Sequence, residues 1–548
     1  MFGIGSGKLP TVMKHDFSQV PKADIPRSSF DRSHGFKSTF NAGYLVPFFV
    51  DEALPGDTFS LRASLFARLA TPVAPVMDNL HCDTFFFAVP IRLIWDNFKK
   101  MMGEQEPNTF TSYLVPIMTS PTGGYAVQSL QDYMGLPTAG TYGVDATKTV
   151  SHSALWTRAY NLIYNEWFRD QNLQASVTVD KGDGPDDPAN YVLLRRGKRH
   201  DYFTSCLPWP QKGTAVSIPL GTSAPIRGVN GSGTVDDLVY LFGDSNGAFV
   251  RSDTTPQTNG NLRFGGAGSI AANATMKWQQ ASDNGGSVDG YNIADLSAAT
   301  AATINSLRQA FQLQRLYERD ARGGTRYTEI VRSHFGVTSP DARLQRPEYL
   351  GGGSTPITFT PIPQTSVTAA TPQGNLAAMA TMSGTGHGFS KSFTEHCVLI
   401  GLVSVRADLN YQQGLNRMWS RRSKYDFYWP ALSHVGEQAV LNKEIYCRGD
   451  TNDALVFGYQ EAYAEYRYKP SVITGQFRST YSTPLDVWHL GQKFTALPTL
   501  GSTFIVENPP VDRIIAVAGS HFLFDAYLQL KCARPMPTYS VPGMIDHF

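Results

Sequence analysis

Two long segments of the chain alternate between apolar and polar residues. In residues 59–70 every odd position is apolar, while the even positions include Arg62 and Arg68. Residues 522–532 repeat the pattern near the other end of the chain. A period of two places one face of a β-strand on a core and the other face in water or against a neighbour. We therefore predict a long strand in each segment.

Shorter apolar runs predict strands of a second kind. Residues 84–89 and 398–403 are almost continuously apolar, which is typical of strands buried on both faces or within a sandwich. Residues 513–518 form a further short candidate. Because the predicted strands lie near both ends of the chain, they must pair over long sequence separations. This arrangement favours one large β-domain over a string of small ones.

Helical spacing is found in two places only. Residues 155–170 carry aromatic and aliphatic side chains at helical intervals, and residues 297–322 do so over a longer stretch. Gly323-Gly324 follows the second segment, where a helix C-cap is expected. Residues 13–35, by contrast, show no sustained period and contain several prolines, so we interpret residues 1–40 as an extended N-terminal arm.

The segment 211–290 has a different composition from its surroundings. Gly, Ser, Thr, Asn and Asp supply 41 of its 80 residues. Such a composition is compatible with disorder, but aromatic residues such as Phe242 and Trp278 could anchor an ordered fold. We favour an ordered surface insertion that interrupts a single domain spanning residues 41–548.

Composition and charge exclude several classes of protein. The 548 residues carry a formal net charge of +1, and 49 Gly, 34 Pro and 12% aromatics suit turn-rich β-structure. This balance argues against a wholly basic nucleic-acid coat and against an acidic disordered chain. Five widely spaced cysteines give no disulfide framework, which favours a reducing compartment. No apolar run is long enough for a signal peptide or a transmembrane helix.

Enzyme chemistry is not indicated by the sequence. The chain has no HExxH segment, no nucleophile-elbow motif and no zinc-like spacing of Cys and His. We therefore predict a protein that is not an enzyme, with no cofactor and no metal site.

Basic residues interleaved with aromatic ones are the main chemical signal. The candidate nucleic-acid-binding residues are Arg417, Trp419, Arg421, Arg422, Lys424 and Tyr425. Cations can neutralise phosphates while aromatic faces stack on unpaired bases. Weaker clusters occur at 195–199, 315–326 and 463–469. The alternative is structural, with arginines stacked on aromatic rings and paired with Asp426 or Glu437.

Several blocks of sequence resemble the major capsid proteins of microviruses, in particular the gokushovirus branch of these small single-stranded DNA bacteriophages. The matching segments are FDRSH at 30–34, LPGDTF at 54–59, residues 71–79, QLQRLYERDARGGTRY at 312–327, PDARLQRPEYL at 340–350, YQQGL at 411–415, YWP at 428–430, residues 458–461, YRYKP at 466–470, and residues 537–539 and 542–543. They are spread over nearly the whole chain except 211–290.

The resemblance implies a mainly β fold, an eight-stranded antiparallel viral jelly-roll β-sandwich with long loop insertions and a few helices. It implies a structural protein that self-assembles into a T=1 icosahedral shell of roughly 60 copies around circular single-stranded DNA. It also implies a variable insertion at the three-fold axes of the shell. We assign this insertion to residues 211–290 and expect it to serve host attachment.

The partners implied are further copies of the chain, the single-stranded DNA genome, a scaffolding protein, a small basic DNA-binding protein, a DNA pilot protein and a host surface receptor. The expected location is the virion, after assembly in the bacterial cytoplasm, without membrane insertion. We expect Trp419, Arg421, Arg422 and Lys424 to line the inner surface. Two alternatives stay open: a secreted-type β-sandwich carbohydrate-binding module and a free-standing single-strand DNA-binding protein.

Overall fold

The computed structural model describes residues 26–104, 111–214, 216, 304–341, 343–368 and 372–539, with short strands between 226 and 294. The chain divides into two compact units, Met1–Pro210 with Asp320–Phe548, and Gln211–Arg319. Of the predicted N-terminal arm 1–40, residues 1–25 lie outside the described residues, whereas residues 34–40 form a strand of the main sheet. Most of the predicted insertion 211–290 also lies outside the described residues.

Eight strands of the first unit build the main fold. They are β2 (His34–Phe40), β3 (Val46–Ala53), β4 (Thr58–Leu69), β5 (Leu80–Pro90), β13 (Glu348–Pro363), β14 (Leu376–Ser392), β15 (Cys397–Ala407) and β20 (Phe522–Arg534). In chain order the first pairs with the last, the second with the seventh, the third with the sixth and the fourth with the fifth. Every pairing is antiparallel, so the chain forms one long hairpin of four strand pairs.

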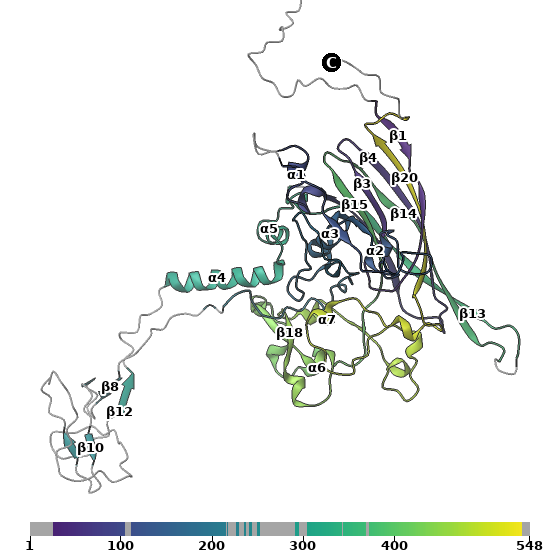
Figure 1. The fold of residues 1–548 in the computed structure, drawn as a ribbon. Helices are drawn as coiled ribbons and strands as arrows, with labels where there is room; N and C mark the ends of the chain where they lie inside the picture. Colours follow the sequence, from purple (N-terminus) through teal and green to yellow (C-terminus); the bar gives the residue numbers. More distant parts are fainter. Residues whose placement is uncertain are drawn as a thin grey trace, which may run out of the picture. The chain divides into compact units, whose positions relative to one another are not determined.

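This hairpin is rolled up into two facing sheets. One has the order β2-β20-β4-β14 and the other β3-β15-β5-β13, and the β13–β14 hairpin joins them. The curled antiparallel arrangement is visible in Figure 1. A rolled hairpin of eight strands is a jelly roll, which confirms the predicted fold class. The short strand β1 (Ser28–Asp31) continues the edge along β20.

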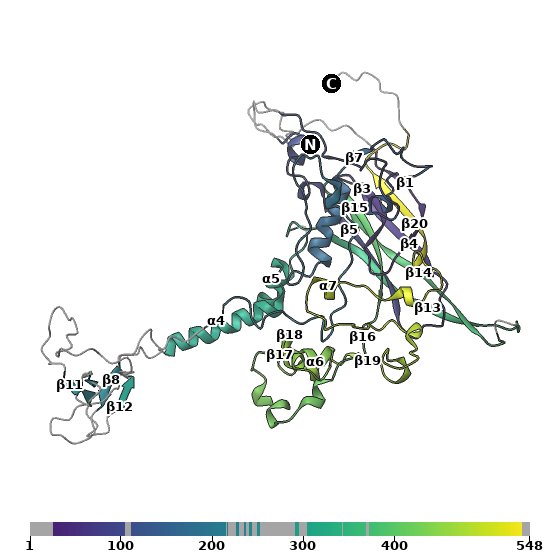
Figure 2. The same cartoon turned by 60° about the horizontal axis from the view of Figure 1, so that its bottom comes forward.

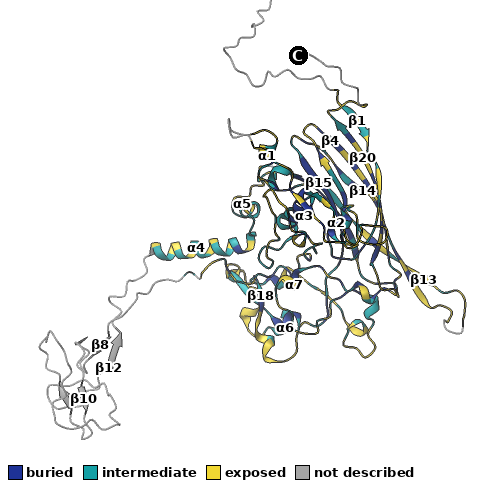
Figure 3. Ribbon diagram, viewed as in Figure 1, coloured by how far each residue is buried: buried dark blue, intermediate teal, exposed yellow. Residues whose placement is uncertain are grey.

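The alternating segments behave as their pattern predicts. In β4 and β20 one residue in two is buried between the sheets, and the residues between them are exposed. The two strands pair directly, with Leu65 opposite Ala526 and Phe66 opposite Asp525. Figure 3 shows this as alternating colours along the strands. Both predicted strands are therefore confirmed, together with their long-range pairing.

The other sheet is covered on its outer face by a helix. α3 (Leu155–Ile163), continued by the π-turn η3 (Tyr164–Phe168), packs Leu155, Ala159 and Ile163 into a second core with Val398 and Ile400. All eleven residues of β15 are consequently buried. The apolar run predicted to be a doubly buried strand is confirmed, and the helix predicted over 155–170 is the element that buries it.

The remaining described elements are shorter. In the first unit they include α1 (Phe98–Met101), α2 (Leu130–Tyr133), α5 (Tyr327–Phe335), α6 (Asn442–Ile445) and α7 (Ser502–Ile505), and the strands β6 (Ile117–Thr119), β7 (Ser151–Ser153), β16 (Asn410–Tyr411), β17 (Glu437–Leu441), β18 (Val456–Glu461) and β19 (Ser471–Val472). The β17–β18 hairpin and α6 lie at the end of the sheets opposite β1 (Figures 1 and 2).

The second unit contains β8 (Ile226–Val229), β9 (Val235–Asp236), β10 (Leu241–Gly243), β11 (Phe249–Arg251) and β12 (Tyr291–Ala294). The helix α4 (Ile304–Gly323) belongs mostly to this unit, and it ends before Gly324, whose φ of +93° is left-handed. This agrees with the helix and the glycine cap predicted there, while residues 297–303 lie outside the described residues.

One predicted strand is wrong. Residues 513–518 form no strand; the 3-10 turn η13 (Val511–Arg513) leads into an isolated bridge between Pro72 and Ile515. Pro509 and Pro510 precede this turn, and proline cannot donate to a strand ladder. Ile514 and Ile515 are buried because the turn packs on the main core, whereas Val517 is exposed.

The described residues hold no helix that is both long and apolar enough to cross a lipid bilayer. All five cysteines are free thiols.

A buried histidine connects the two sheets. Nδ1 of His387 lies 2.7 Å from the Thr84 hydroxyl, and Nε2 lies 2.9 Å from the Thr355 hydroxyl. A Cβ on Gly353 would lie only 2.8 Å from Nε2 of this ring. The absence of a side chain at position 353 therefore makes room for the histidine.

We expect His387 to make folding stability depend on pH. Burial lowers the pKa of His387 below its ordinary 6.5, although the nearby Asp83 carboxylate opposes this. As the pH falls through 6.5 the unfolded chain binds a proton that the folded chain does not bind. The contribution of the neutral His387 to folding stability is therefore fully present above pH 6.5. It is lost as the pH falls from 6.5 towards the lowered pKa of the folded state.

The measurement is the thermal unfolding midpoint at about pH 7.5 and about pH 5.5. His387→Gln, which keeps hydrogen-bonding groups but cannot titrate, should lose less stability between these two values than the wild type. His434→Gln, at an exposed histidine, serves as the control and should behave as the wild type does. An equal loss in all three proteins would contradict the assignment.

Candidate nucleic-acid interface

The six candidate residues lie in one loop of the first unit, between β16 and β17. This basic loop (residues 416–432) folds into three 3-10 turns, η6 (Arg417–Ser420), η7 (Lys424–Asp426) and η8 (Pro430–Leu432). Side chains accept backbone N–H groups at the starts of the first two turns and so stabilise them. The Asn416 side chain accepts the N–H of Met418 at 3.0 Å, and the Asp426 carboxylate accepts the N–H groups of Arg422 and Ser423. These hydrogen bonds also lower the pKa of Asp426.

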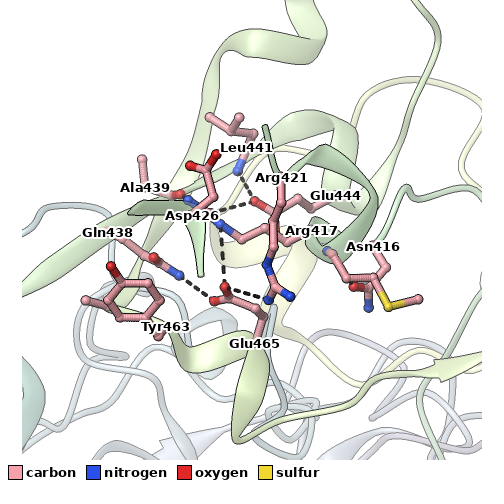
Figure 4. A network of polar contacts seen from close by, with 12 residues as sticks. Asn416, Arg417, Arg421, Asp426, Gln438, Ala439, Leu441, Glu444, Tyr463 and Glu465 are labelled. Carbon is pink, nitrogen blue, oxygen red and sulfur yellow. Dashed lines mark hydrogen bonds and ion pairs between the residues drawn. The ribbon is translucent and has the colours of Figure 1, made fainter. Parts of the chain in front are cut away.

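Two of the candidate arginines are bound to carboxylates of the same chain. Arg417 donates to Glu444 Oε1 at 3.0 Å and to the carbonyl oxygen of Ala439 at 2.7 Å. Arg421 donates to Glu465 Oε1 at 3.3 Å. Figure 4 shows both guanidinium groups directed at these carboxylates. The side chains of Glu444 and Glu465 are only 2% and 6% exposed, so the two arginines neutralise buried charge.

The environment of Glu444 shows why it needs a partner. Burial raises the pKa of the Glu444 carboxyl, against the opposing effects of the Leu441 N–H and of Arg417. The Tyr202 hydroxyl donates to the other carboxylate oxygen at 2.9 Å. A buried carboxylate is costly unless it is paired and hydrogen-bonded. Arg417 is therefore a structural residue of this loop.

The cluster predicted at 463–469 packs against the basic loop. The Tyr463 hydroxyl donates to the carbonyl oxygen of Tyr425 at 2.9 Å, and its ring lies 5.5 Å from that of Tyr428. The guanidinium of Arg421 stacks 4.3 Å above the Tyr466 ring. Two clusters that are separate in the sequence therefore form one surface.

The other four candidates point outward. Trp419 is 72% exposed and Tyr425 is 63% exposed, and Arg422 and Lys424 are exposed as well. The amine of Lys424 lies 5.0 Å from the Tyr425 ring centroid. Further exposed apolar side chains of the same surface are Met418, Phe427, Tyr428, Trp429, Tyr466 and Tyr468. Exposed rings beside cations suit base stacking with phosphate neutralisation, and they equally suit contact with another subunit.

For Arg417 and Arg421 the structure supports the alternative that these arginines are paired within the protein. Their partners, however, are not Asp426 or Glu437. Asp426 caps backbone groups of its own loop, while Glu437 pairs with Arg322. The carboxylates that hold the arginines, Glu444 and Glu465, were not found from the sequence. Glu465 lies between the tyrosines of the 463–469 cluster, which is the only local signal for it.

The remaining basic clusters lie elsewhere. Residues 195–199, Arg322 and Arg326 belong to the first unit, and Arg315 and Arg319 to the second. Within the described residues, no group of three or more potential metal ligands comes together.

Charge-neutralising substitutions should separate structural from exposed arginines. Arg417→Gln leaves Glu444 buried without its cation, and we expect a loss of about 2 kcal/mol or more in the free energy of unfolding. Arg422→Gln, in the same loop, should change it by less than about 0.5 kcal/mol. Denaturant unfolding of the two purified subunits measures both values. Equal losses in the two variants would show that Arg417 is not a structural residue.

Comparison with known proteins gives a consistent result. Residues 18–544 match the family described as capsid protein (F protein). The chain is 48% identical over 545 residues to capsid protein VP1 of Bdellovibrio phage phiMH2K, with 98% of each chain covered. It is 47% identical to capsid protein VP1 of Chlamydia phage 1, covering 98% of this chain and 99% of the relative.

Capsid protein VP1 of Spiroplasma virus 4 is 37% identical, with 97% of each chain covered. The gokushovirus-type resemblance predicted from the sequence is thereby confirmed, and with it a structural role as a component of the virion. The jelly roll, the near-complete family match and these full-length relatives show that the chain belongs to the capsid F protein family.

Proposed function

We propose that this chain is the subunit of a T=1 icosahedral shell that encloses circular single-stranded DNA. Membership of the capsid family supports assembly into a shell. The enclosure of DNA rests on one observation, the exposed basic and aromatic side chains that the basic loop presents on a rigidly anchored support. In this proposal Trp419, Arg422, Lys424 and Tyr425 face the interior and contact the genome.

Arg417 and Arg421 have a different part in the proposal. Because they are bound to Glu444 and Glu465, they hold the loop and orient its rings rather than neutralise phosphates. Arg421 still lies at the inner surface, where its guanidinium supports the exposed Tyr466 ring.

Self-association is supported by the β13–β14 hairpin. Its distal part, where residues 359–363 pair with residues 376–380, extends beyond the other strands of the sheets (Figures 1 and 2). Ile362, Val367 and Met379 are exposed there. A two-stranded ribbon with exposed apolar side chains is marginally stable in water. A neighbouring copy of the chain would cover these residues in the shell.

Further partners follow from charge and from the family. A subunit with a net charge of +1 cannot neutralise a genome by itself, which supports a small basic DNA-binding protein as a partner. A scaffolding protein, a DNA pilot protein and assembly in the bacterial cytoplasm complete the proposal. Host attachment is assigned to 211–290, whose composition sets it apart from the rest of the chain.

Co-expression of the chain with its neighbouring reading frames tests the proposal. We expect uniform isometric particles in negative-stain microscopy, holding DNA that resists nuclease. The triple variant Trp419→Ala, Arg422→Gln, Lys424→Gln should assemble but protect roughly half as much DNA per particle or less, because stacking and phosphate contacts are lost.

Arg448→Gln, an exposed arginine outside the basic loop, is the control and should protect the wild-type amount. Particles that are empty in the wild type would contradict the enclosure of DNA. Unchanged DNA content in the triple variant would contradict the role of the basic loop, and monomers under all assembly conditions would contradict the shell.

A further inference from the structure

A large cavity lies in the first unit, away from the basic loop. Its volume is about 1020 Å³, and four segments line it, residues 167–172, 196–200, 204–207 and 321–326, together with Glu329 and the rings of Phe85, Phe87 and Tyr349. A cavity of this size can hold a small organic ligand. Two of the basic clusters noted in the sequence meet here, the cluster at 195–199 and the end of the long helix.

The lining is strongly cationic. Its cations are Arg169, Arg196, Lys198, Arg199, Arg322 and Arg326, against the acidic residues Asp170 and Glu329. Some of the cations are paired: Arg196 binds Asp83 at 2.6 Å, and Arg322 binds Glu437. Asp170 is also occupied, since it accepts N–H groups of its own turn. The cavity therefore keeps an excess of positive charge.

Arg169, which has no ion-pair partner in the described part of the chain, lies beside Arg326 in this lining. Arg326 donates to the carbonyl oxygens of Asn165 and Arg169 and pairs with Glu329 at 3.1 Å. Arg169 donates to the carbonyl oxygen of Gln174 at 2.8 Å. The Nε atoms of both arginines are buried and have no hydrogen-bond partner in the described part of the chain. Burial and the charge of Arg326 lower the pKa of Arg169, against the opposing effects of Glu166, Tyr164 and Asp170.

An anion would relieve this arrangement. Two neighbouring guanidinium groups repel each other. Their Nε atoms are sealed from the cavity, so the anion would bind the outer guanidinium nitrogens. A phosphate offers several acceptor oxygens, and guanidinium groups bind it through charge-assisted hydrogen bonds.

Aromatic rings form another wall of the same cavity. The Phe85 and Phe168 rings lie 5.1 Å apart, and the Trp167 and Tyr349 rings 5.9 Å apart. Tyr349 remains 41% exposed. A partly open aromatic wall beside an anion site suits a ligand that carries both a phosphate and a flat ring.

We propose that this cavity binds one nucleotide of a single-stranded DNA, with its phosphate at Arg169 and Arg326 and its base against the aromatic wall. The inference deepens the proposed function, because it rests on DNA being the anion that the subunit meets. It assigns to the shell subunit a discrete nucleotide site besides the surface of the basic loop.

Calorimetric titration of the purified full-length subunit tests the site, with deoxyadenosine monophosphate, inorganic phosphate and hexaglutamate as probes. We expect saturable binding of the nucleotide and weaker binding of phosphate. Arg169→Gln should weaken nucleotide binding about tenfold, and Tyr349→Leu should weaken it several-fold while leaving phosphate binding unchanged. Arg448→Gln should bind as the wild type does.

Three results would overturn the site: no saturable binding by the wild type, equal nucleotide affinity in all variants, or phosphate binding as tightly as the nucleotide. Tighter binding of hexaglutamate would assign the cavity to an acidic protein segment instead. Tyr349→Leu keeps the test decisive if Arg169→Gln does not fold. Failure here leaves the proposed function intact if particles still protect DNA through the basic loop.

Discussion

The architecture depends on the pairing of the first core strand with the last. β20 lies between β2 and β4, so residues from the two ends of the chain form adjacent rungs of one sheet. The other three strand pairs are formed by strands that lie between β2 and β20 in the chain. The segments that connect these strands leave the sandwich at its ends. The covering helix α3 and the basic loop are both such connections. The fold therefore determines where the functional segments can be displayed.

Buried carboxylates apply a similar constraint to the basic loop. Its backbone makes short turns with little regular structure, and it is held in place by Arg417 and Arg421 reaching inward to Glu444 and Glu465. The positive charge of these two arginines is neutralised by carboxylates of the same chain. What the loop offers to a ligand is the remaining set, with Trp419 and Tyr425 as stacking surfaces beside two exposed cations. Positive charge in a sequence is thus a poor measure of positive charge on a surface.

The sequence predicted the elements whose side-chain period reflects burial. The strands of residues 59–70, 84–89, 398–403 and 522–532 were found because a strand exposes or buries alternate residues, or buries them all under a helix. The β13–β14 hairpin was missed, because its glycine-rich start has low strand propensity and is set by close approach to His387. The segment 513–518 was misassigned, because buried isoleucines in a turn imitate a short strand.

The candidate site was predictable only in part. The clustering of arginines with aromatic residues identified the right loop, since those residues adjoin in the sequence. Their ion-pair partners are distant in the sequence, and only tertiary structure brings Glu444 to Arg417. The convergence of the clusters at 195–199 and 322–326 on one cavity also needed the fold. Local composition can locate a functional segment, but it cannot divide its charges between structure and ligand.

The central claim is that the basic loop contacts the enclosed genome. Ultraviolet crosslinking of intact, DNA-filled particles, followed by mass spectrometry of the crosslinked peptides, tests it most directly. The account predicts crosslinks at Trp419 and Tyr425, in peptides of residues 416–432. Crosslinks that spare this loop and gather on other surfaces of the subunit would contradict it.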